Sequence, residues 1–388
     1  MKKIGIVLGS APGAGVFQYT QAIVDGLSSL PADEYELVGA YLDPVWVTHV
    51  KADRIRLVPI RDSLWDRALN RAWHALRLPN SLWRHVALSL NATARTLVRE
   101  QCDLWICPGH ERWAFRAPIS ALGTVHDLMH RYERQFPEVS ANGQFEQREF
   151  HFTETCKWSK GILVDSEVGR RQLCEAYGVS PDSVFVLPYI PPSYIYAAST
   201  HDSRAVRSLP ARYFFYPAQF WMHKNHTTLF AALDRVRKNH PDVRLVLVGA
   251  PHNGYQQARD KVRELELEDH VIFLGYVPDS EMAELYRRAR ALIMPSFFGP
   301  TNIPQLEAFA IGCPVAASAV YGVPEQVGDA ALLFDPRSAE EIAECMERLW
   351  TDDALCATLI ERGKKKAAEW GPEQFNRRLR DIVDALAA

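Results

Sequence analysis

A basic loop in the second half of the chain has the residue types that bind phosphate. Residues 216–226 read Tyr-Pro-Ala-Gln-Phe-Trp-Met-His-Lys-Asn-His and follow an apolar run typical of a β-strand. On such a strand-to-helix loop, Lys224, His223 and His226 could neutralise diphosphate oxygens, since these loops lie at the ligand-binding edge of a parallel sheet. An exposed lysine without a ligand is the commoner case, so the loop alone leaves both interpretations open.

A second candidate is the start of a helix just after residue 301. Pro304 is typical of a first helical turn, and either Asn302 or Ile303 is the cap. The backbone N–H groups of residues 301–303 would then face the end of the preceding strand and attract an anion. We expect Glu307 in that first turn, where its carboxylate either interacts favourably with the helix dipole or accepts hydrogen bonds from the paired hydroxyls of a ribose.

The first half offers two weaker candidates. Residues 9–20 are rich in glycine up to Gly15 and lead into a helix predicted at 21–30. Glycines let backbone N–H groups approach an anion, but the spacing is not G-x-G-x-x-G, and a tight turn is an equal alternative. His126 and Asp127 end a predicted strand, where a histidine satisfied within the protein is the usual explanation.

Short β-rich runs alternate with helical patterns twice, which predicts two parallel sheets covered by helices. The predicted strands are at 3–8, 36–41, 103–107, 121–126, 161–165, 184–187, 213–217, 244–248, 271–274, 291–295, 314–317 and 332–334. Prolines before residue 194 and the polar run 198–208 predict a linker. We therefore expect an α/β fold with domains at 1–197 and 198–370, and a C-terminal helix at 371–388 that packs on the first domain.

Length and composition fit this expectation. A chain of 388 residues suits two domains, and a net charge of −3 supplies no general field for nucleic acid. Seven cysteines without a C-x-x-C pair favour free thiols in a reducing, cytoplasmic compartment over a zinc site. No run approaches the roughly 18 to 20 apolar residues of a membrane-spanning helix.

Residues 61–100 are a helical, aromatic and basic insertion. Arginines at 61, 67, 71, 77, 84, 95 and 99 alternate with Trp65, Trp73 and Trp83. Such a pattern can place a helix on an anionic membrane, whereas the commoner alternative is a solvated helical pair whose tryptophans pack inward. Peripheral membrane contact through this insertion is left open.

Taken together, these segments resemble the retaining glycosyltransferases of family four, the group 1 glycosyltransferases of the GT-B fold. The resemblance is most specific from Phe273-Leu-Gly-Tyr-Val-Pro-Asp-Ser-Glu to Pro304-Gln-Leu-Glu-Ala-Phe-Ala-Ile-Gly-Cys-Pro-Val. It implies two Rossmann-like doubly wound domains facing across a cleft. The first would bind the acceptor and the second the nucleotide sugar.

The resemblance also implies a role for individual residues. His126 would lie at the sugar, Lys224 at the diphosphate and Glu307 at the nucleotide ribose, and these three are the predicted catalytic residues. The backbone from Thr301 to Ile303 would hold the distal phosphate. The predicted donor-binding residues are Gly15, Gln219, His223, Asn225, Gly249, Tyr276, Val277, Gly299, Thr301, Asn302 and Ile303.

Two positions depart from the family pattern. Gly299 stands where the family usually has a glutamate, and Gln219 stands where it usually has an arginine. The missing arginine removes one positive partner of the departing diphosphate, and His223 or His226 could compensate for it. Recognition of the donor sugar stays open at this stage.

We therefore predict a metal-independent transferase that moves a hexose, such as mannose, from a GDP- or UDP-sugar. The acceptor would be a glycan or a lipid-linked molecule in surface polysaccharide synthesis. No two aspartates are two residues apart, so no D-x-D metal clamp is expected, and no cofactor or metal is needed. A non-catalytic nucleotide-sugar-binding partner, an NAD-dependent oxidoreductase and a nucleotide-sugar epimerase are the alternatives. Donor, acceptor, linkage and oligomeric state do not follow from the sequence.

Overall fold

The computed structural model describes residues 1–11, 15–51, 53–61, 64–76, 78–196, 208–299 and 301–387, without the side chains of 67, 70, 71, 74 and 75. Two compact units result. Unit 1 comprises Met1–Leu128, Phe145–Pro188 and Pro372–Ala388, and unit 2 comprises Met129–Gln144 and Tyr189–Gly371. Residues 197–207 of the predicted linker and residues 12–14 of the glycine-rich stretch lie outside the described residues.

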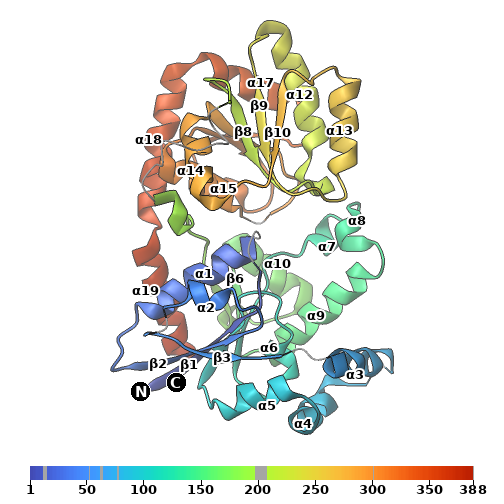
Figure 1. The fold of residues 1–388 in the computed structure, drawn as a ribbon, viewed down its shortest axis with the longest axis vertical. Coiled ribbons are helices and arrows are strands. Elements are labelled where there is room, and N and C mark those ends of the chain that lie inside the picture. Colours follow the sequence, from blue (N-terminus) through green and yellow to red (C-terminus); the bar gives the residue numbers. More distant parts are fainter. Residues whose placement is uncertain are drawn as a thin grey trace. The chain divides into compact units, whose positions relative to one another are not determined.

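Unit 1 is built on a seven-stranded parallel sheet of order β3-β2-β1-β4-β5-β6-β7. Figure 1 labels β1, β2, β3 and β6 of this sheet. Its strands are β1 (Lys2–Leu8), β2 (Tyr35–Tyr41), β3 (Arg56–Pro59), β4 (Leu104–Ile106), β5 (Ala121–Thr124), β6 (Gly161–Val164) and β7 (Val184–Val186). Its helices are α1 (Gly15–Ser28), α2 (Trp46–His49), α3 (Leu64–Ala75), α4 (Asn80–Leu90), α5 (Ala92–Arg99), α6 (Trp113–Arg116), α9 (Gln144–Trp158), α10 (Glu167–Tyr177) and α19 (Pro372–Leu386). The helix α19 packs on α1, and Lys2 pairs with Asp384 at 2.7 Å, so both termini lie together in this unit.

Unit 2 is built on a six-stranded parallel sheet of order β10-β9-β8-β11-β12-β13. Its strands are β8 (Phe214–Pro217), β9 (Leu245–Val248), β10 (Val271–Gly275), β11 (Ala291–Met294), β12 (Val315–Ser318) and β13 (Ala331–Phe334). Its helices are α7 (Met129–Tyr132), α8 (Pro137–Ser140), α12 (His226–Asn239), α13 (Tyr255–Glu264), α14 (Asp279–Arg288), α15 (Ile303–Ile311), α16 (Val323–Val327), α17 (Ala339–Thr351) and α18 (Asp353–Glu369). Short 3-10 turns occur at η2 (Ser193–Tyr196) and η3 (Met222–Lys224).

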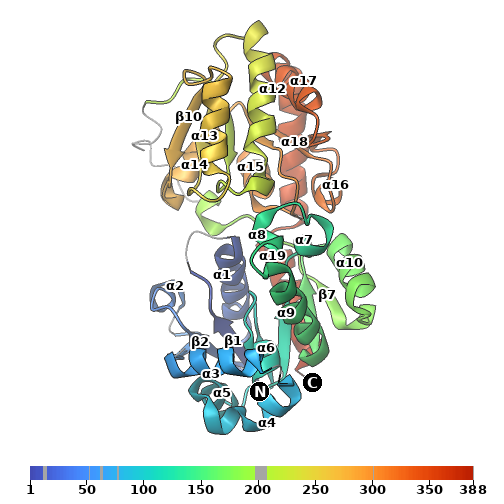
Figure 2. The ribbon, with the colours of Figure 1, turned by 90° about the vertical axis from the view of Figure 1, so that its right-hand side faces the viewer.

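The sequence of the strands explains why both faces of each sheet are covered. The strands β9 and β11 read Leu-Val-Leu-Val and Ala-Leu-Ile-Met, and every one of these residues is buried. A run without polar alternation is stable only where helices exclude water from both faces. In unit 2, Figure 2 shows α12 running beside α17 on the sheet, and these two helices are in contact. The twelve predicted strands agree with the observed ones to within two residues at each end.

Three features differ from the expectations. The helix α1 begins at Gly15, so the residues after Gly15 form its first turns and not a loop before residue 21. The patterns do not predict β3, because Arg56–Pro59 is a short edge strand with a charged residue and a proline. Residues 129–144 cluster with unit 2, although the predicted domain boundary lies at residue 197.

The basic insertion forms α3, α4 and α5. Trp83 is buried and meets the half-buried Trp73 edge to face at 5.0 Å, as the inward-packing alternative expects. Trp65 instead is exposed, together with Leu64 and Leu76. Within the described ranges, no helix combines the length and the apolar character that crossing a bilayer requires.

Candidate functional site

The candidate site of unit 2 lies where the strand order of its sheet reverses. The strands β8 and β11 are neighbours, but β9 follows β8 on one side and β12 follows β11 on the other. The loops that leave the carboxyl ends of β8 and β11 therefore diverge at the position where open α/β sheets bind ligands. A hydrogen bond joins them, since the Phe297 N–H donates to the His223 carbonyl at 2.8 Å. The two sequence candidates of the second half are thus brought together.

The loop after β8 is held in a fixed shape by Asn225. Its backbone has a φ of 59°, a left-handed conformation that asparagine tolerates. The Asn225 side chain donates to the carbonyls of Pro295 at 3.0 Å and Pro336 at 2.7 Å, and accepts from Thr228 at 2.6 Å. These bonds tie the loop to its neighbours, so Asn225 holds the segment that carries Lys224.

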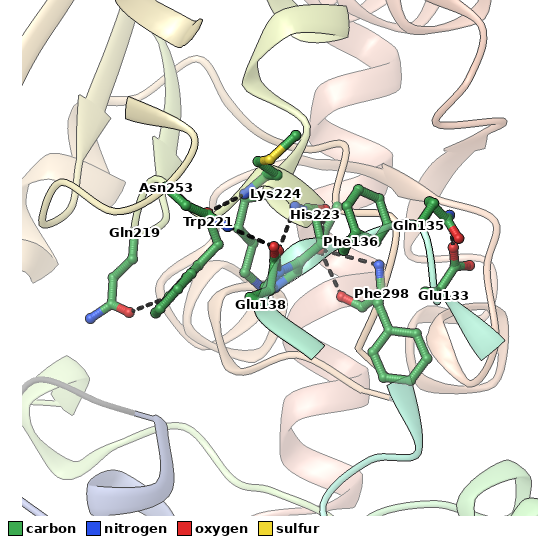
Figure 3. Close-up of polar contacts among 12 residues, drawn as sticks. Glu133, Gln135, Phe136, Glu138, Gln219, Trp221, His223, Lys224, Asn253 and Phe298 are labelled. Atoms are coloured by element: carbon green, nitrogen blue, oxygen red, sulfur yellow. Dashed lines mark hydrogen bonds and ion pairs between the residues drawn. The ribbon is translucent and has the colours of Figure 1, made fainter. Parts of the chain in front are cut away.

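His223 is held by a carboxylate from the segment 129–144 (Figure 3). Its ring Nδ1 lies 2.7 Å from Glu138 Oε1, and its backbone N–H donates to the same oxygen at 3.1 Å. Asn253 Nδ2 donates to Glu138 Oε2 at 2.8 Å. Although burial opposes it, the hydrogen bonds from His223 and Asn253 lower the pKa of Glu138 to about 2, so this carboxylate is ionised at neutral pH.

His226 has a different environment from His223. It is the first residue of α12, is buried, and stacks on Phe220 with ring centroids 4.3 Å apart. Burial lowers the pKa of His226 to about 3, so the ring is neutral at pH 7. A neutral imidazole cannot replace a missing arginine charge, and of the two histidines only His223 fits that role.

The start of α15 matches the expected position but differs in detail. Asn302 is the cap residue by backbone geometry, without a side-chain cap hydrogen bond. Its N–H donates to Gln326 Oε1 at 2.9 Å, and Gln326 Nε2 donates to its carbonyl at 2.8 Å. The predicted phosphate contact of the Asn302 N–H would therefore need Gln326 to move. The helix itself begins at Ile303, at the expected place.

Glu307 is buried and belongs to the second turn of α15, not to the first turn as expected. The hydroxyl of Tyr286 donates to Oε2 at 2.5 Å, and that of Tyr194 donates to Oε1. Burial raises the pKa of Glu307, while the two tyrosine hydrogen bonds lower it. Both carboxylate oxygens already have donors, so a ligand hydroxyl would share or replace the bond from a tyrosine.

The remaining predicted residues of unit 2 lie in the loops after β8, β9, β10 and β11. Trp221 Nε1 donates to Gln219 Oε1 at 3.0 Å. A Cβ at Gly249 would overlap the backbone of residues 218 and 219, so this glycine is needed for close packing of two loops. Tyr276 is 75% exposed, the adjacent Val277 is buried, and Gly299 has a φ of 138°.

In unit 1, His126 follows β5 at the carboxyl edge of the sheet and is buried. Its ring Nε2 lies 2.8 Å from the Pro108 carbonyl, and the rings of Tyr19 and His110 lie 5.4 and 5.5 Å away. Burial lowers the pKa of His126 to about 4, which keeps the imidazole neutral at pH 7. Because a carbonyl oxygen only accepts, Nε2 is the ring nitrogen that donates to Pro108. Gly15 opens α1 in the same unit.

Sequence reasoning misses Glu138, Tyr194 and Tyr286. Glu138 lies far from His223 in the chain and carries no motif, so no sequence signal could have paired them. The two tyrosines are spaced from Glu307 by 113 and 21 residues and meet it only in the fold. Among the described residues, no group of three or more His, Cys, Asp or Glu side chains is placed to hold a metal ion, and the metal-independent reaction stays a prediction.

Sequence comparison finds a family match in the second half of the chain. Residues 201–366 match the family described as glycosyl transferases group 1. A stretch of 106 residues, 27% of this chain, is 37% identical to O-antigen chain mannosyltransferase B of Escherichia coli. Over 265 residues, 63% of this chain, the identity to D-inositol 3-phosphate glycosyltransferase of Corynebacterium aurimucosum is 28%. The alignments span 28% and 62% of the lengths of these two relatives.

The fold is similar to that of solved glycosyltransferases over the whole chain. Sucrose-phosphate synthase from Thermosynechococcus elongatus superposes with a TM-score of 0.75 at 20% identity, covering 100% of this chain and 99% of that one. Anabaena HepE in complex with UDP and glucose superposes with a TM-score of 0.74 at 17% identity, covering 99% and 100%. Residues 201–366 thus match the group 1 glycosyl transferase family, and the whole chain has the GT-B fold.

Proposed function

We propose that the protein is a retaining, metal-independent glycosyltransferase that moves a hexose from a nucleoside diphosphate sugar to a glycan or lipid-linked acceptor. The observation that carries this proposal is the junction of two loops at the strand-order reversal of unit 2. One loop brings Lys224 and His223, and the other leads into the N-terminus of α15. Positive groups from both loops suit a diphosphate.

Each residue has a chemical task in this proposal. Breaking the sugar–phosphate bond builds negative charge on the departing diphosphate, and positive groups placed beforehand lower that barrier. Lys224 and the N-terminus of α15 would meet this charge, with His223 as a second cation. Glu307 would accept a ribose hydroxyl in place of the bond from Tyr194 or Tyr286.

The donor and acceptor belong to the proposal as well. The similarity to O-antigen chain mannosyltransferase B supports mannose as the sugar and a surface polysaccharide as the acceptor. HepE was solved with UDP and glucose, which supports a nucleoside diphosphate without deciding between UDP and GDP here. On the acceptor side, neutral His126 would orient the sugar by hydrogen bonding and would not provide a fixed charge.

Calorimetry with UDP, GDP and NAD tests the donor site directly. We expect UDP or GDP to bind, NAD not to bind, and Lys224→Ala to weaken the binding about tenfold or more, since it removes one charge-assisted contact. Lys238→Ala is the matched control, because Lys238 is an exposed lysine of the same unit that pairs with Asp234 at 3.1 Å. If K224A binds as tightly as K238A, the lysine does not contact the diphosphate and the assignment of this site fails.

The reaction itself is tested by turnover. Incubation of GDP-mannose or UDP-glucose with lipid-linked or glycan acceptors should transfer sugar only when an acceptor is present. The proton NMR spectrum of the product should show that the transferred sugar has the same anomeric configuration as in the donor. An inverted product would contradict the retaining mechanism, and binding without turnover of any donor would favour a non-catalytic partner protein.

We also propose that α3 contacts the cytoplasmic face of a membrane. Among the described side chains, Leu64 and Trp65 of α3 and Leu76 just after it are exposed, whereas Asp66 is buried. Exposed apolar residues of this kind suit contact with a membrane surface. Binding to anionic vesicles should fall with salt and should be weakened by Trp65→Ser, with neutral vesicles as the control. Equal binding by the variant would remove α3 from the contact.

A further inference from the structure

The segment 129–144 is part of unit 2, although the strands before and after it belong to unit 1. It packs through Met129, Phe136 and Val139, which form a buried cluster with Phe298 from the loop after β11. The Phe136 ring also lies 6.2 Å from the ring of His223. The segment therefore contacts both loops of the candidate donor site.

Glu138 is the charged residue that this segment brings to the loop after β8. Its side chain is only 7% exposed, and the side chain of His223 is 15% exposed. Three hydrogen bonds converge on the carboxylate, two from His223 and one from Asn253, at distances of 2.7 to 3.1 Å. A carboxylate that is desolvated to this extent and still ionised must be matched by donors and by positive charge.

The contact fixes the proton on one ring nitrogen of His223. An ionised carboxylate only accepts hydrogen bonds, so Nδ1 carries the hydrogen that points at Glu138. A neutral ring would then present an acceptor at Nε2, and an acceptor repels a phosphate oxygen. Only the doubly protonated ring can donate from Nε2, and a carboxylate 2.7 Å away favours that form.

We propose that Glu138 is a positioning residue of the donor site, which holds His223 in its orientation and in its charged form so that the ring acts as a second cation beside Lys224. This inference rests on the proposed function and deepens it. Because Gln219 carries no charge, the histidine paired with Glu138 supplies the cation that the arginine of the family pattern would have supplied.

Other charged and titratable groups face His223 as well. Lys224 follows His223 in η3, and His226 is the first residue of α12. The three side chains are close together, since, besides burial, the charges of Lys224 and His223 both lower the pKa of His226. Lys224 opposes protonation of His223, while His226 is neutral. The segment 129–144 adds Glu138, and the loop after β11 adds the uncharged Phe297. Among these groups of the described residues, Glu138 is the one that favours the proton.

The test is the pH dependence of binding of UDP or GDP, whichever the wild-type protein binds, measured by calorimetry between pH 6 and 9. We expect the wild type to take up protons on binding, measured as a heat that depends on the ionisation enthalpy of the buffer, and to bind less tightly as pH rises. Glu138→Gln should move this loss of affinity to lower pH by about one unit and weaken binding about tenfold at pH 7.5, since one pKa unit is tenfold in affinity.

Two further variants make the result specific. Glu133→Gln is the matched control, because Glu133 is a buried carboxylate of the same segment that accepts from Tyr321 at 2.5 Å instead of from His223. In a His223→Gln background, Glu138→Gln should have no additional effect on binding, because Glu138 acts through the ring. Proton uptake should also disappear in His223→Gln.

Each outcome separates this inference from the proposed function. If no nucleoside diphosphate binds to the wild type, both fail. If binding occurs and depends on Lys224 but E138Q has the pH profile of E133Q, only the role of Glu138 fails. A wild type that binds without proton uptake at every pH from 6 to 9 overturns the inference even if E138Q does not fold, and so does an equal effect of E138Q with and without His223.

Discussion

Replacing Gly299 by glutamate would restore the residue of the family pattern, and we predict that it damages the protein. Gly299 has a φ of 138°, a conformation that residues with a Cβ rarely adopt. A Cβ at this position would lie 2.5 Å from Oδ1 and 2.7 Å from Nδ2 of Asn302, whose side chain is buried. The loop is thus built around glycine, and an added side chain would displace the cap residue of α15.

The expected loss of stability follows from these two effects. Backbone strain of this kind costs about 1 to 3 kcal/mol, and forcing a side chain into occupied space costs a similar amount. We expect the free energy of unfolding of unit 2 to fall by about 2 to 4 kcal/mol, because Asn302 can relieve part of the overlap by rotating. Nucleotide affinity should fall together with it, since residues 301–303 move.

Urea unfolding followed by tryptophan fluorescence measures the first effect, and calorimetry with UDP or GDP measures the second. Gly275→Glu is the matched control, since Gly275 has a φ of 71° but a Cβ added there would meet no atom within 4 Å. It should show the backbone strain without the overlap. A Gly299→Glu variant as stable as the wild type, or one that binds nucleotide more tightly, would refute the reasoning.

Three more predictions follow from single contacts. Gly249→Ala should destabilise unit 2 by about 1 to 3 kcal/mol, because the added Cβ meets the backbone of Ala218. A variant with the same urea unfolding midpoint as the wild type would contradict this. Tyr286→Phe should cost about 1.5 to 3 kcal/mol, because Glu307 loses a donor inside the protein, and unchanged stability would mean that the bond contributes little. Burial raises the pKa of the Glu111 carboxyl to about 7, above its unfolded value of 4.5. The stability that Glu111 contributes is therefore fully present below pH 4.5 and is lost as the pH rises to about 7. Glu111→Gln should therefore gain stability relative to the wild type across that range, and parallel pH profiles would exclude the effect.

The regular elements could be predicted because their physical causes are local. Fully apolar runs such as β9 and β11 have no polar alternation, and Pro304 with Gly312 marks the two ends of α15. The edge strand β3 lacks that signal, since it needs only one partner strand. Candidate residues on one loop, such as His223 and Lys224, are equally visible because a short spacing keeps them together.

Contacts that depend on the path of the chain could not be predicted. Glu138 and His223 are separated by 85 residues, and no periodicity connects them. The tyrosines on Glu307 and the Gln326 bonds to Asn302 are likewise products of tertiary packing. Burial likewise depends on the fold: His226 is buried, which lowers the pKa of its ring, whereas His223 three residues earlier is partly exposed.

The return of the chain to unit 1 has a consequence for synthesis on the ribosome. The helix α19 covers α1, and Leu379 lies so close to Gly26 that a Cβ there would be only 2.8 Å from its Cδ2. The apolar side of α1 is made early but receives this cover only when α19 emerges, after all of unit 2. A nascent chain would hold that surface open during most of translation, so a chaperone that binds exposed apolar helices should associate with the growing N-terminal half and leave when α19 is released.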